Sequence, residues 1–359
     1  MLKNMAKVLL VGSGMTGAAT ASMLRQHLPD NTSIFIWDKA RGAGGRMTTT
    51  RCPEDASITA DLGAQYFTLT QEYSAKRQST YDELIAHGIF TPLQGQIEGP
   101  NDFNQPGAQH FVTPQGSSSL VKYFLQKSKA TVKYQHQVSE ISFDNCSPVS
   151  VTTQEDRSED FDVVILTIPV PQVLQLKGSL HEWIGNCPDM KKKLQNVSYS
   201  SRYALGLFFP QRTELNYRWC AKYISDNPCL RYIAIDQAKR GISQVNQGKS
   251  IVLHTSVPFG LAHLEEDMNF VKEEILGHVR NILPELPKPI SMKPQRWRYS
   301  QVHQAYEGTP GCVVISTNPL VILAGDGFSL STFDGCLDSA EAVLKAVMDN
   351  FKTVQGSSS

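Results

Sequence analysis

Three glycines and an aspartate near the N-terminus have types and a spacing that can bind phosphate and sugar. Gly12, Gly14 and Gly17 form a G-x-G-x-x-G pattern, and Asp38 follows 21 residues after the last glycine. Such glycines permit a tight turn, leave room for a diphosphate against the backbone and let a helix pack close to a strand. An aspartate at this distance can accept hydrogen bonds from ribose hydroxyls. The pattern predicts a dinucleotide site; the alternative is a glycine turn in an ordinary βαβ unit.

The segments that flank these residues have the pattern of a strand, a helix and a second strand. Residues 8–11 form a short apolar run, residues 18–28 are alanine-rich with apolar residues at helical spacing, and residues 33–37 form a second strand-like run. A strand, a helix and a strand in this order direct the helix N-terminus and its amide groups at the diphosphate. We therefore expect a Rossmann-type unit here.

A second glycine loop favours a flavin dinucleotide. Gly44, Gly45 and Arg46 lie shortly after Asp38. Backbone at these glycines can approach the far side of the diphosphate, and the planar guanidinium of Arg46 can pair with phosphate oxygens. A permanently held flavin commonly has two such loops, whereas a transient nicotinamide cofactor rarely needs them. A flexible surface loop is the alternative.

The C-terminal part contains a candidate for the other end of the flavin site. Gly325 and Asp326 follow an apolar run at residues 321–324, and Asp326 can bind a ribityl hydroxyl. A helix over residues 336–347 can direct its N-terminus at the flavin pyrimidine ring, where negative charge develops on reduction. A β-turn is the alternative for the Gly-Asp-Gly stretch.

Residues 61–67 contain two polar side chains that can reach the flavin ring or its substrate. Gly63 allows close backbone approach, and Gln65 and Tyr66 place an amide and a phenol beyond it. A turn glutamine and a core tyrosine are the alternative for this pair.

The order of strand-like and helix-like segments predicts an α/β fold, and the length of 359 residues predicts two domains. The hydrophobic share of 41% is enough for a sizeable core. The expected elements are helices over 74–87, 117–126 and 264–283, strand-like runs at 131–143, 161–169, 203–209, 230–235, 250–257 and 296–299, a hairpin at 150–160 and a loop at 94–109. We expect a Rossmann-type FAD-binding domain at 1–75, 130–175 and 296–352. A substrate domain with a mixed β-sheet and flanking helices is expected at 76–129 and 176–295, followed by a disordered tail at 353–359.

Composition excludes several classes of partner. Lysine plus arginine equals aspartate plus glutamate at 34 each, so there is no general attraction to nucleic acid or to an anionic membrane. No apolar run approaches the roughly 20 residues of a membrane span. The seven cysteines have no C-x-x-C or zinc spacing, which predicts no metal site and favours reduced thiols in the cytoplasm.

These motifs together resemble the renalase family, within the amine-oxidase-like flavoprotein group. The resemblance covers about residues 7–351 and is carried by the stretches at 37–39, 44–49, 60–66, 199–208 and 325–328. It implies that FAD is held non-covalently. The cofactor-binding residues that we predict are Gly12, Gly14, Thr16, Gly17, Asp38, Lys39, Gly45, Arg46, Gln65, Tyr66, Val138, Gly325, Asp326 and Phe333.

The resemblance also implies an activity, the oxidation of 1,2- and 1,6-dihydro-NAD(P) to β-NAD(P)⁺. Hydride passes to flavin N5, and O2 reoxidises the flavin to give hydrogen peroxide. We predict Tyr66 and Trp297 as walls of the catalytic site, with Arg231 and His254 as hydrogen-bond partners for the carboxamide, ribose or phosphates. Ordinary packing is the alternative for Trp297 and His254, and an exposed salt bridge is the alternative for Arg231.

Two other functions are compatible with the sequence. One is a flavin amine oxidase of the catecholamine type. The other is a secreted signalling protein that binds a cell-surface receptor, with residues 229–248 and their basic pair Lys239 and Arg240 as the candidate surface or as a solvated loop. The family resemblance favours an extracellular location, and cysteine usage favours the cytoplasm.

Overall fold

The computed structural model describes residues 6–101, 105–144, 148–242 and 248–356. It divides into two compact units, each built from separate stretches of chain. Unit 1 comprises residues 1–45, 121–199 and 302–359, and unit 2 comprises residues 46–120 and 200–301. The expected fold class, an α/β protein with a Rossmann-type unit and a mixed sheet, is confirmed.

The unit boundaries differ from the predicted domain boundaries. The segments assigned differently are 46–75, 121–129, 176–199 and 296–301. Leu62 packs with Ala204 in one buried cluster, which ties the stretch after residue 45 to unit 2. Leu180 packs in the same core as Leu166, which ties its segment to unit 1. Sequence patterning predicts the elements, but the core that each element joins depends on contacts between distant residues.

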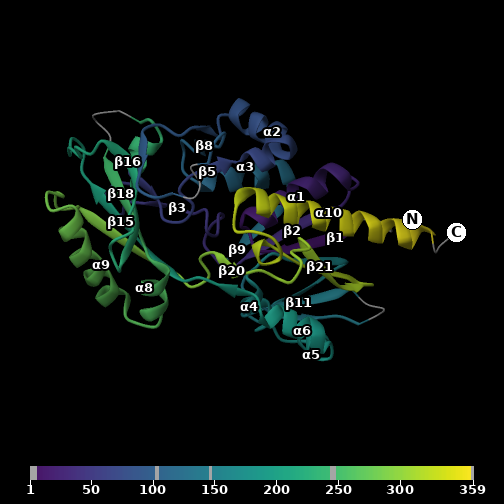
Figure 1. The fold of residues 1–359 in the computed structure, drawn as a ribbon. Helices are drawn as coiled ribbons and strands as arrows, with labels where there is room; N and C mark the ends of the chain where they lie inside the picture. The colour runs from purple at the N-terminus through teal and green to yellow at the C-terminus, as the bar shows by residue number, and fades with distance from the viewer. Residues whose placement is uncertain (1–5, 102–104, 145–147, 243–247, 357–359) are drawn as a thin grey trace. The chain divides into compact units, whose positions relative to one another are not determined.

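Unit 1 is built on a six-stranded sheet in which five strands are parallel and β21 is antiparallel to its neighbour. The strand order is β21 (Cys312–Thr317), β22 (Leu320–Ala324), β13 (Val163–Leu166), β1 (Lys7–Val11), β2 (Ser33–Asp38) and β9 (Thr131–Tyr134). Helices α1 (Met15–His27) and α10 (Phe333–Gly356) pack against each other and against these strands (Figure 1). Strands buried on both faces explain the nearly continuous apolar runs in the sequence.

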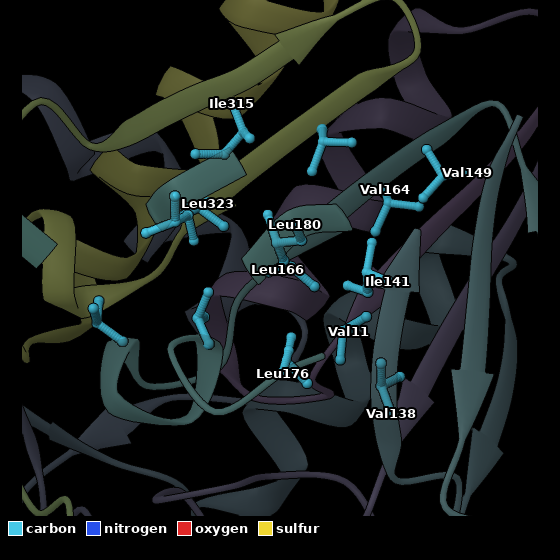
Figure 2. Close-up of a cluster of buried hydrophobic side chains, with 14 of the residues drawn as sticks. Val11, Val138, Ile141, Val149, Val164, Leu166, Leu176, Leu180, Ile315 and Leu323 are labelled. Atoms are coloured by element: carbon cyan, nitrogen blue, oxygen red, sulfur yellow. The ribbon is translucent and has the colours of Figure 1, made fainter. Parts of the chain in front are cut away.

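The other face of this sheet is covered by a small antiparallel sheet and three short helices. These are β10 (Val138–Ser142), β11 (Val149–Thr153), β12 (Ser158–Phe161), α4 (Val170–Val173), α5 (Ser179–Gly185) and α6 (Pro188–Gln195). Figure 2 shows Leu166 of the central sheet gathered with Ile141 and Leu180 of the covering elements. The pair β14 (Ser198–Tyr199) and β20 (Val302–Gln304), together with the 3₁₀ turn η1 (Asp326–Phe328), completes unit 1.

Unit 2 is built on a mixed six-stranded sheet. Its order is β19 (Ser291–Trp297), β15 (Arg202–Phe209), β18 (Lys249–Thr255), β17 (Leu230–Ile235), β16 (Trp219–Tyr223) and β7 (Gln96–Glu98), with only β7 and β16 parallel. Helices α8 (Val257–Ala262) and α9 (Met268–Ile282) cover one face, where Leu205, Ile233 and Leu253 pack with Ile275 and Val279. The opposite face carries the polar and aromatic side chains described below.

Smaller elements complete unit 2. They are the hairpin β3 (Thr49–Arg51) and β4 (Thr59–Asp61), the sheet β5 (Phe67–Leu69), β8 (Gln109–Val112) and β6 (Thr91–Pro92), and the helices α2 (Gln71–Ala86) and α7 (Asp236–Lys239). Helix α3 (Ser118–Ser128) crosses the boundary at residue 120.

Three local predictions are wrong. The expected loop at 94–109 contains β7, which pairs with β16. The expected strand at 131–143 is divided between two sheets, because Gln135 has a φ of 56° and turns the chain. The expected disordered tail begins as the end of α10, which continues to Gly356, and residues 357–359 lie outside the described residues. No helix within the described residues has the length and apolar character needed to span a membrane.

Candidate active site

The first glycine turn of unit 1 leaves an open space at the N-terminus of α1. Gly12 has a φ of 110°, and a Cβ atom at this position would lie 2.9 Å from Thr167 Oγ1. A Cβ atom on Gly17 would overlap the carbonyl oxygen of Gly12, so this glycine is required for helix–strand packing. A Cβ atom on Gly14 would meet nothing within 4 Å. The space above Gly14 is where a diphosphate would contact the helix N-terminus.

The late glycine of unit 1 lies beside this turn. Strands β1, β13 and β22 are adjacent and in register, with Val11 opposite Leu166 and Leu166 opposite Leu323. A Cβ atom on Gly12 would contact the Thr167 side chain, and one on Gly325 would lie 3.4 Å from Thr167 O. The two glycine motifs, about 300 residues apart in the sequence, therefore flank the same residue.

The second glycine loop of unit 1 contacts the first. Gly44 N donates to Ser13 O at 3.1 Å, and a Cβ atom on Gly45 would lie 3.5 Å from Gly14 Cα. Gly45 has a φ of 54°, a left-handed conformation that glycine adopts without a steric penalty. The two glycine loops are therefore in contact, as a single diphosphate site would require, and we call them together the glycine cradle.

Asp38 ends β2 next to this cradle. Its Oδ2 accepts from Ser13 N and Ser13 Oγ, both at 2.7 Å, and its Oδ1 accepts from Ala40 N at 2.8 Å. A carboxylate offers about four acceptor positions, so Asp38 keeps capacity for a ribose hydroxyl. Exposed Lys39 lines a cavity of about 220 Å³ together with Arg41 and His136.

The other predicted cofactor residues of unit 1 are buried. Thr16 lies in the first turn of α1 and is 5% exposed. Asp326 is also 5% exposed, and its Oδ2 accepts from Ser331 Oγ. The side chains of Val138 and Phe333 lie in the core, so their side chains are structural and contact with a cofactor would come through their backbone.

These residues of unit 1 fit an FAD. A phosphate group needs close approach to backbone amides, which the open space at Gly14 and the contact between the glycine loops provide. The ribose and ribityl hydroxyls need acceptors, which Asp38 and Asp326 can supply. The residues that would hold FAD in unit 1 are therefore those around Gly12, Gly14, Asp38, Gly45 and Asp326.

In unit 2 one row of the sheet places aromatic and polar side chains on a single face. Trp297 of β19 is opposite Arg202 of β15, and Ala204, two residues further along the same face, is opposite His254 of β18. His254 is opposite Tyr232 of β17, which is opposite Tyr223 of β16. Residues opposite each other in a ladder share a face, so the row crosses five strands. We call this row the polar face.

Arg231 reaches the polar face through a β-bulge. The register of β17 against β18 shifts between Leu230 and Tyr232, so two residues of β17 oppose one of β18. A bulge re-aims the extra side chain. The guanidinium carbon of Arg231 lies 5.7 Å from the centroid of the Tyr223 ring, and its Nη1 donates to Ile224 O at 3.0 Å. The salt bridge considered as the alternative for Arg231 is absent among the described residues.

Hydrogen bonds fix several of the aromatic side chains on or beside the polar face. Tyr66 Oη lies 2.6 Å from Tyr223 Oη. Trp297 Nε1 donates to Leu62 O at 2.9 Å, and His254 Nε2 lies 3.1 Å from the same oxygen. The four predicted residues Tyr66, Trp297, Arg231 and His254 therefore lie on or beside one face of unit 2.

The titratable groups of the polar face are uncharged near neutral pH, apart from its arginines. Burial, with a smaller contribution from the positive charge of Arg202, lowers the pKa of His254 to about 4. Burial raises the pKa values of Tyr66, Tyr223 and Tyr232 above their ordinary value. The face therefore offers neutral donors and acceptors to a ligand.

Gln65 is held by a buried charged network rather than exposed on a turn. Its Nε2 donates to Asp61 O and Gly63 O, and its Oε1 accepts from Lys239 Nζ at 2.7 Å. Lys239 is 1% exposed and also pairs with Asp236 at 2.7 Å. With these bonds made, the side chain of Gln65 fixes the loop before Tyr66.

This network corrects the interpretation of the basic pair as a surface. Arg240 is 8% exposed and bonds to Asp61 at 2.6 Å and to Asp236 at 3.0 Å. Burial would raise the pKa of Asp236, but the charges of Lys239 and Arg240 outweigh it and lower that pKa. Lys239 and Arg240 are thus interior residues of unit 2, and part of the candidate receptor segment, residues 243–247, lies outside the described residues.

Arg46 lies at the start of unit 2, where the chain approaches itself closely. Its Nη1 donates to Ser300 O at 3.3 Å, and its carbonyl oxygen accepts from Ala64 N at 3.0 Å. A Cβ atom on Gly63 would overlap that carbonyl, which explains the glycine. The contact of Arg46 with phosphate stays a prediction.

Sequence reasoning missed three polar-face residues. Arg202 lies within the stretch at 199–208 that carries the resemblance, but its charge alone was not a signal. Tyr223 and Tyr232 occur in ordinary alternating strands, and only strand pairing brings them beside His254.

Comparisons with known proteins agree with this architecture. A family model described as flavin containing amine oxidoreductase matches residues 95–348, and one described as an NAD(P)-binding Rossmann-like domain matches residues 10–84. The chain is 40% identical to renalase of Mus musculus over 343 residues, covering 96% of this chain and 99% of that protein.

Solved structures with low sequence identity share the fold. A protein from Exiguobacterium sp. 255-15 that was assigned as a protoporphyrinogen oxidase has a TM-score of 0.72 at 14% identity, covering 95% of this chain and 98% of that one. Putrescine oxidase bound to putrescine has a TM-score of 0.67 at 10% identity, covering 96% and 99%. The family matches, the mouse relative and the glycine cradle lead to one conclusion: the chain belongs to the flavin containing amine oxidoreductase family, as a renalase-like FAD-dependent oxidoreductase.

Proposed function

We propose that this enzyme oxidises 1,2- and 1,6-dihydro-NAD(P) to β-NAD(P)⁺, with O2 as the final acceptor and hydrogen peroxide as the second product. The observation that carries the proposal is the polar face, whose hydrogen-bonding groups other than its arginines are neutral near pH 7. Loss of hydride makes a dihydropyridine aromatic, so this step needs no general base. A face without a base that titrates near neutrality suits this reaction.

Bound FAD supplies the hydride acceptor, its N5 atom. The protein's task is to hold the substrate ring in one plane with the reacting carbon near that acceptor. We assign Trp297 and Tyr66 as walls for the ring, each fixed by a hydrogen bond, to Leu62 O and to Tyr223 respectively. His254, neutral and held beside Leu62 O, is assigned to a polar group such as the carboxamide.

An amine oxidase is the second candidate, because the matching family is the flavin containing amine oxidoreductase family. An amine substrate is a cation in water near neutral pH and is attracted to carboxylates or to aromatic faces. The polar face offers aromatic rings, but its charged members are Arg202 and Arg231. Like charges disfavour binding of an ammonium group beside them.

Anaerobic stopped-flow mixing separates the two candidates. Flavin bleaching by authentic 1,2- and 1,6-dihydro-NAD(P) is expected within seconds, whereas a catecholamine and putrescine should leave the flavin oxidised. After oxygen is admitted, hydrogen peroxide and β-NAD(P)⁺ should appear in equal amounts. Bleaching by an amine but not by either dihydro isomer would replace the proposal with the amine oxidase.

A further inference from the structure

Two arginines of the polar face use little of their hydrogen-bonding capacity. Arg202 Nη1 donates to Thr255 O at 3.1 Å, and Arg231 Nη1 donates to Ile224 O at 3.0 Å. A guanidinium has five N–H donors, so each arginine has donors to spare. Among the residues that the structure describes, neither Arg202 nor Arg231 forms an ion pair with a carboxylate. No carboxylate in this described part of the chain contributes to the pKa shift of Arg202.

The two guanidinium groups lie close enough to influence each other. Burial and then the positive charge of Arg231 lower the pKa of Arg202. Both charges also act on Tyr223, whose ring lies beneath Arg231. Two like charges in partly buried positions repel each other and are poorly hydrated, so an anion bound between them would relieve both costs.

The backbone directs both side chains to this place. Arg202 begins β15, directly opposite Trp297 of β19. Arg231 occupies the bulge of β17, without which strand alternation would direct it to the helix-covered face with Ile233. The arginines therefore share the polar face with Trp297 and His254, the residues assigned to the substrate ring.

The chemistry of this arrangement selects a phosphate. The planar guanidinium fork matches two oxygens of a phosphate group, and paired arginines suit a diphosphate or a phosphomonoester. A flat ring beside Trp297 and a phosphate beside the arginines are the two parts of a nicotinamide nucleotide. We propose that Arg202 and Arg231 form a phosphate-binding subsite for the nucleotide substrate. This inference rests on the proposed function for the identity of the ring.

The test compares phosphate-bearing with phosphate-free ligands on the FAD-loaded enzyme. The ligands are NAD⁺, NADP⁺, nicotinamide mononucleotide and nicotinamide riboside, and binding is measured by isothermal titration calorimetry and by the change in the flavin absorbance spectrum. Arg202→Gln and Arg231→Gln should each raise the Kd of the three phosphate-bearing ligands about tenfold to hundredfold, the range for a hydrogen bond to a charged group. The Kd of the riboside should change by less than about twofold.

The control is Arg298→Gln, which removes one positive charge from unit 2 where the arginine is 43% exposed and paired with Glu265 at 2.6 Å. It should leave all four Kd values within about twofold. The comparison of ligands shows which phosphate group binds to the arginines. If the variants bind NAD⁺ and NADP⁺ equally more weakly, the group is the diphosphate or the 5′-phosphate. If only NADP⁺ binds more weakly, the group is the 2′-phosphate. If Arg202→Gln does not fold, Arg202→Lys and Arg231→Gln test the same point.

Equal weakening of the riboside and the nucleotides, or no weakening of any ligand, would overturn the subsite. Inorganic pyrophosphate titrated alone into the same proteins keeps this test separate from the proposed function, because it contains no nicotinamide. If both arginine variants lose pyrophosphate binding and dihydro-NAD(P) does not bleach the flavin of the wild type, the anion site is retained and the proposed reaction is rejected. If dihydro-NAD(P) bleaches the flavin of the wild type and the variants bind pyrophosphate unchanged, the proposed reaction is retained and the phosphate subsite is rejected.

Discussion

Removal of the Lys239 charge tests whether the buried network holds unit 2 together. Lys239 is 1% exposed, and its Nζ lies 2.7 Å from Asp236 Oδ1 and 2.7 Å from Gln65 Oε1. Lys239→Met keeps the length of the stem but leaves Asp236, which is fully buried, without one of its two cations. Breaking a buried ion pair by removing one partner costs about 3–5 kcal/mol.

The lower end of that range applies here. Asp236 Oδ2 still bonds to Arg240 at 3.0 Å and accepts from Asp61 N at 2.7 Å, so the buried carboxylate stays partly compensated. We expect a loss of about 3 kcal/mol in the free energy of unfolding, which corresponds to a fall in Tm of about 6–12 °C for a unit of this size. The lowered pKa of Asp236 contributes stability above its ordinary value that is lost as the pH falls through the lowered value. The difference between wild type and variant should therefore shrink in acid.

The assay is thermal and denaturant unfolding of the FAD-saturated protein, followed by far-ultraviolet circular dichroism. Lys222→Met is the matched control, because Lys222 pairs with Glu98 at 3.4 Å in the same sheet but is 39% exposed. An exposed pair contributes about 0–1 kcal/mol, so this variant should unfold almost like the wild type. Equal losses in the two lysine variants would refute the reasoning that burial makes the Lys239 network stabilising.

Three further predictions concern the candidate site. Gly14→Ala should raise the Kd for FAD about tenfold or more without loss of fold, because a Cβ atom there fills space open to a diphosphate. Gly42→Ala is the control: a Cβ atom on Gly42 is equally free of contacts, so FAD binding should stay unchanged in a fluorescence titration. Equal effects of the two substitutions on the Kd would contradict the glycine cradle. Because the pKa of His254 is lowered from 6.5 to about 4, His254 lowers the free energy of unfolding by up to about 3 kcal/mol as the pH falls from about 6.5 toward 4. His254→Gln should remove this loss of stability in acid, as measured by denaturant unfolding. The same loss in the variant would show that His254 does not cause it. Trp297→Ala should slow flavin reduction by dihydro-NAD(P) at least about tenfold more than reoxidation by O2 in stopped flow, whereas equal slowing would make Trp297 a purely structural residue.

Much of unit 1 was predictable because its signals are local. The glycine spacing, the apolar runs and the alanine-rich helix each depend on residues within about 40 positions, and they identify the first strand, helix and second strand correctly. The residue types also predict which atoms face a diphosphate, because only glycine allows backbone to approach so closely. The assignment of a flavin depended on combining this local pattern with a second glycine loop.

The polar face of unit 2 was predictable only in part. Tyr66, Trp297, Arg231 and His254 were selected individually, but nothing in their spacing shows that they share a face. The bulge at Arg231 shifts the ladder by one residue, and strand alternation alone predicts the opposite orientation for this side chain. The basic pair Lys239 and Arg240 is interior although its sequence pattern predicts a surface, because composition cannot distinguish a solvated charge from one buried against Asp236.

The Rossmann-type unit, the glycine cradle and the family could be predicted from residue types and short spacings in the sequence. The folded chain was needed to show that Gly12 and Gly325 flank Thr167, that Arg202 and Arg231 share one face, and that Lys239 is interior. Strand order, register and burial depend on contacts between residues far apart in the chain, and a local sequence pattern contains no information about those contacts.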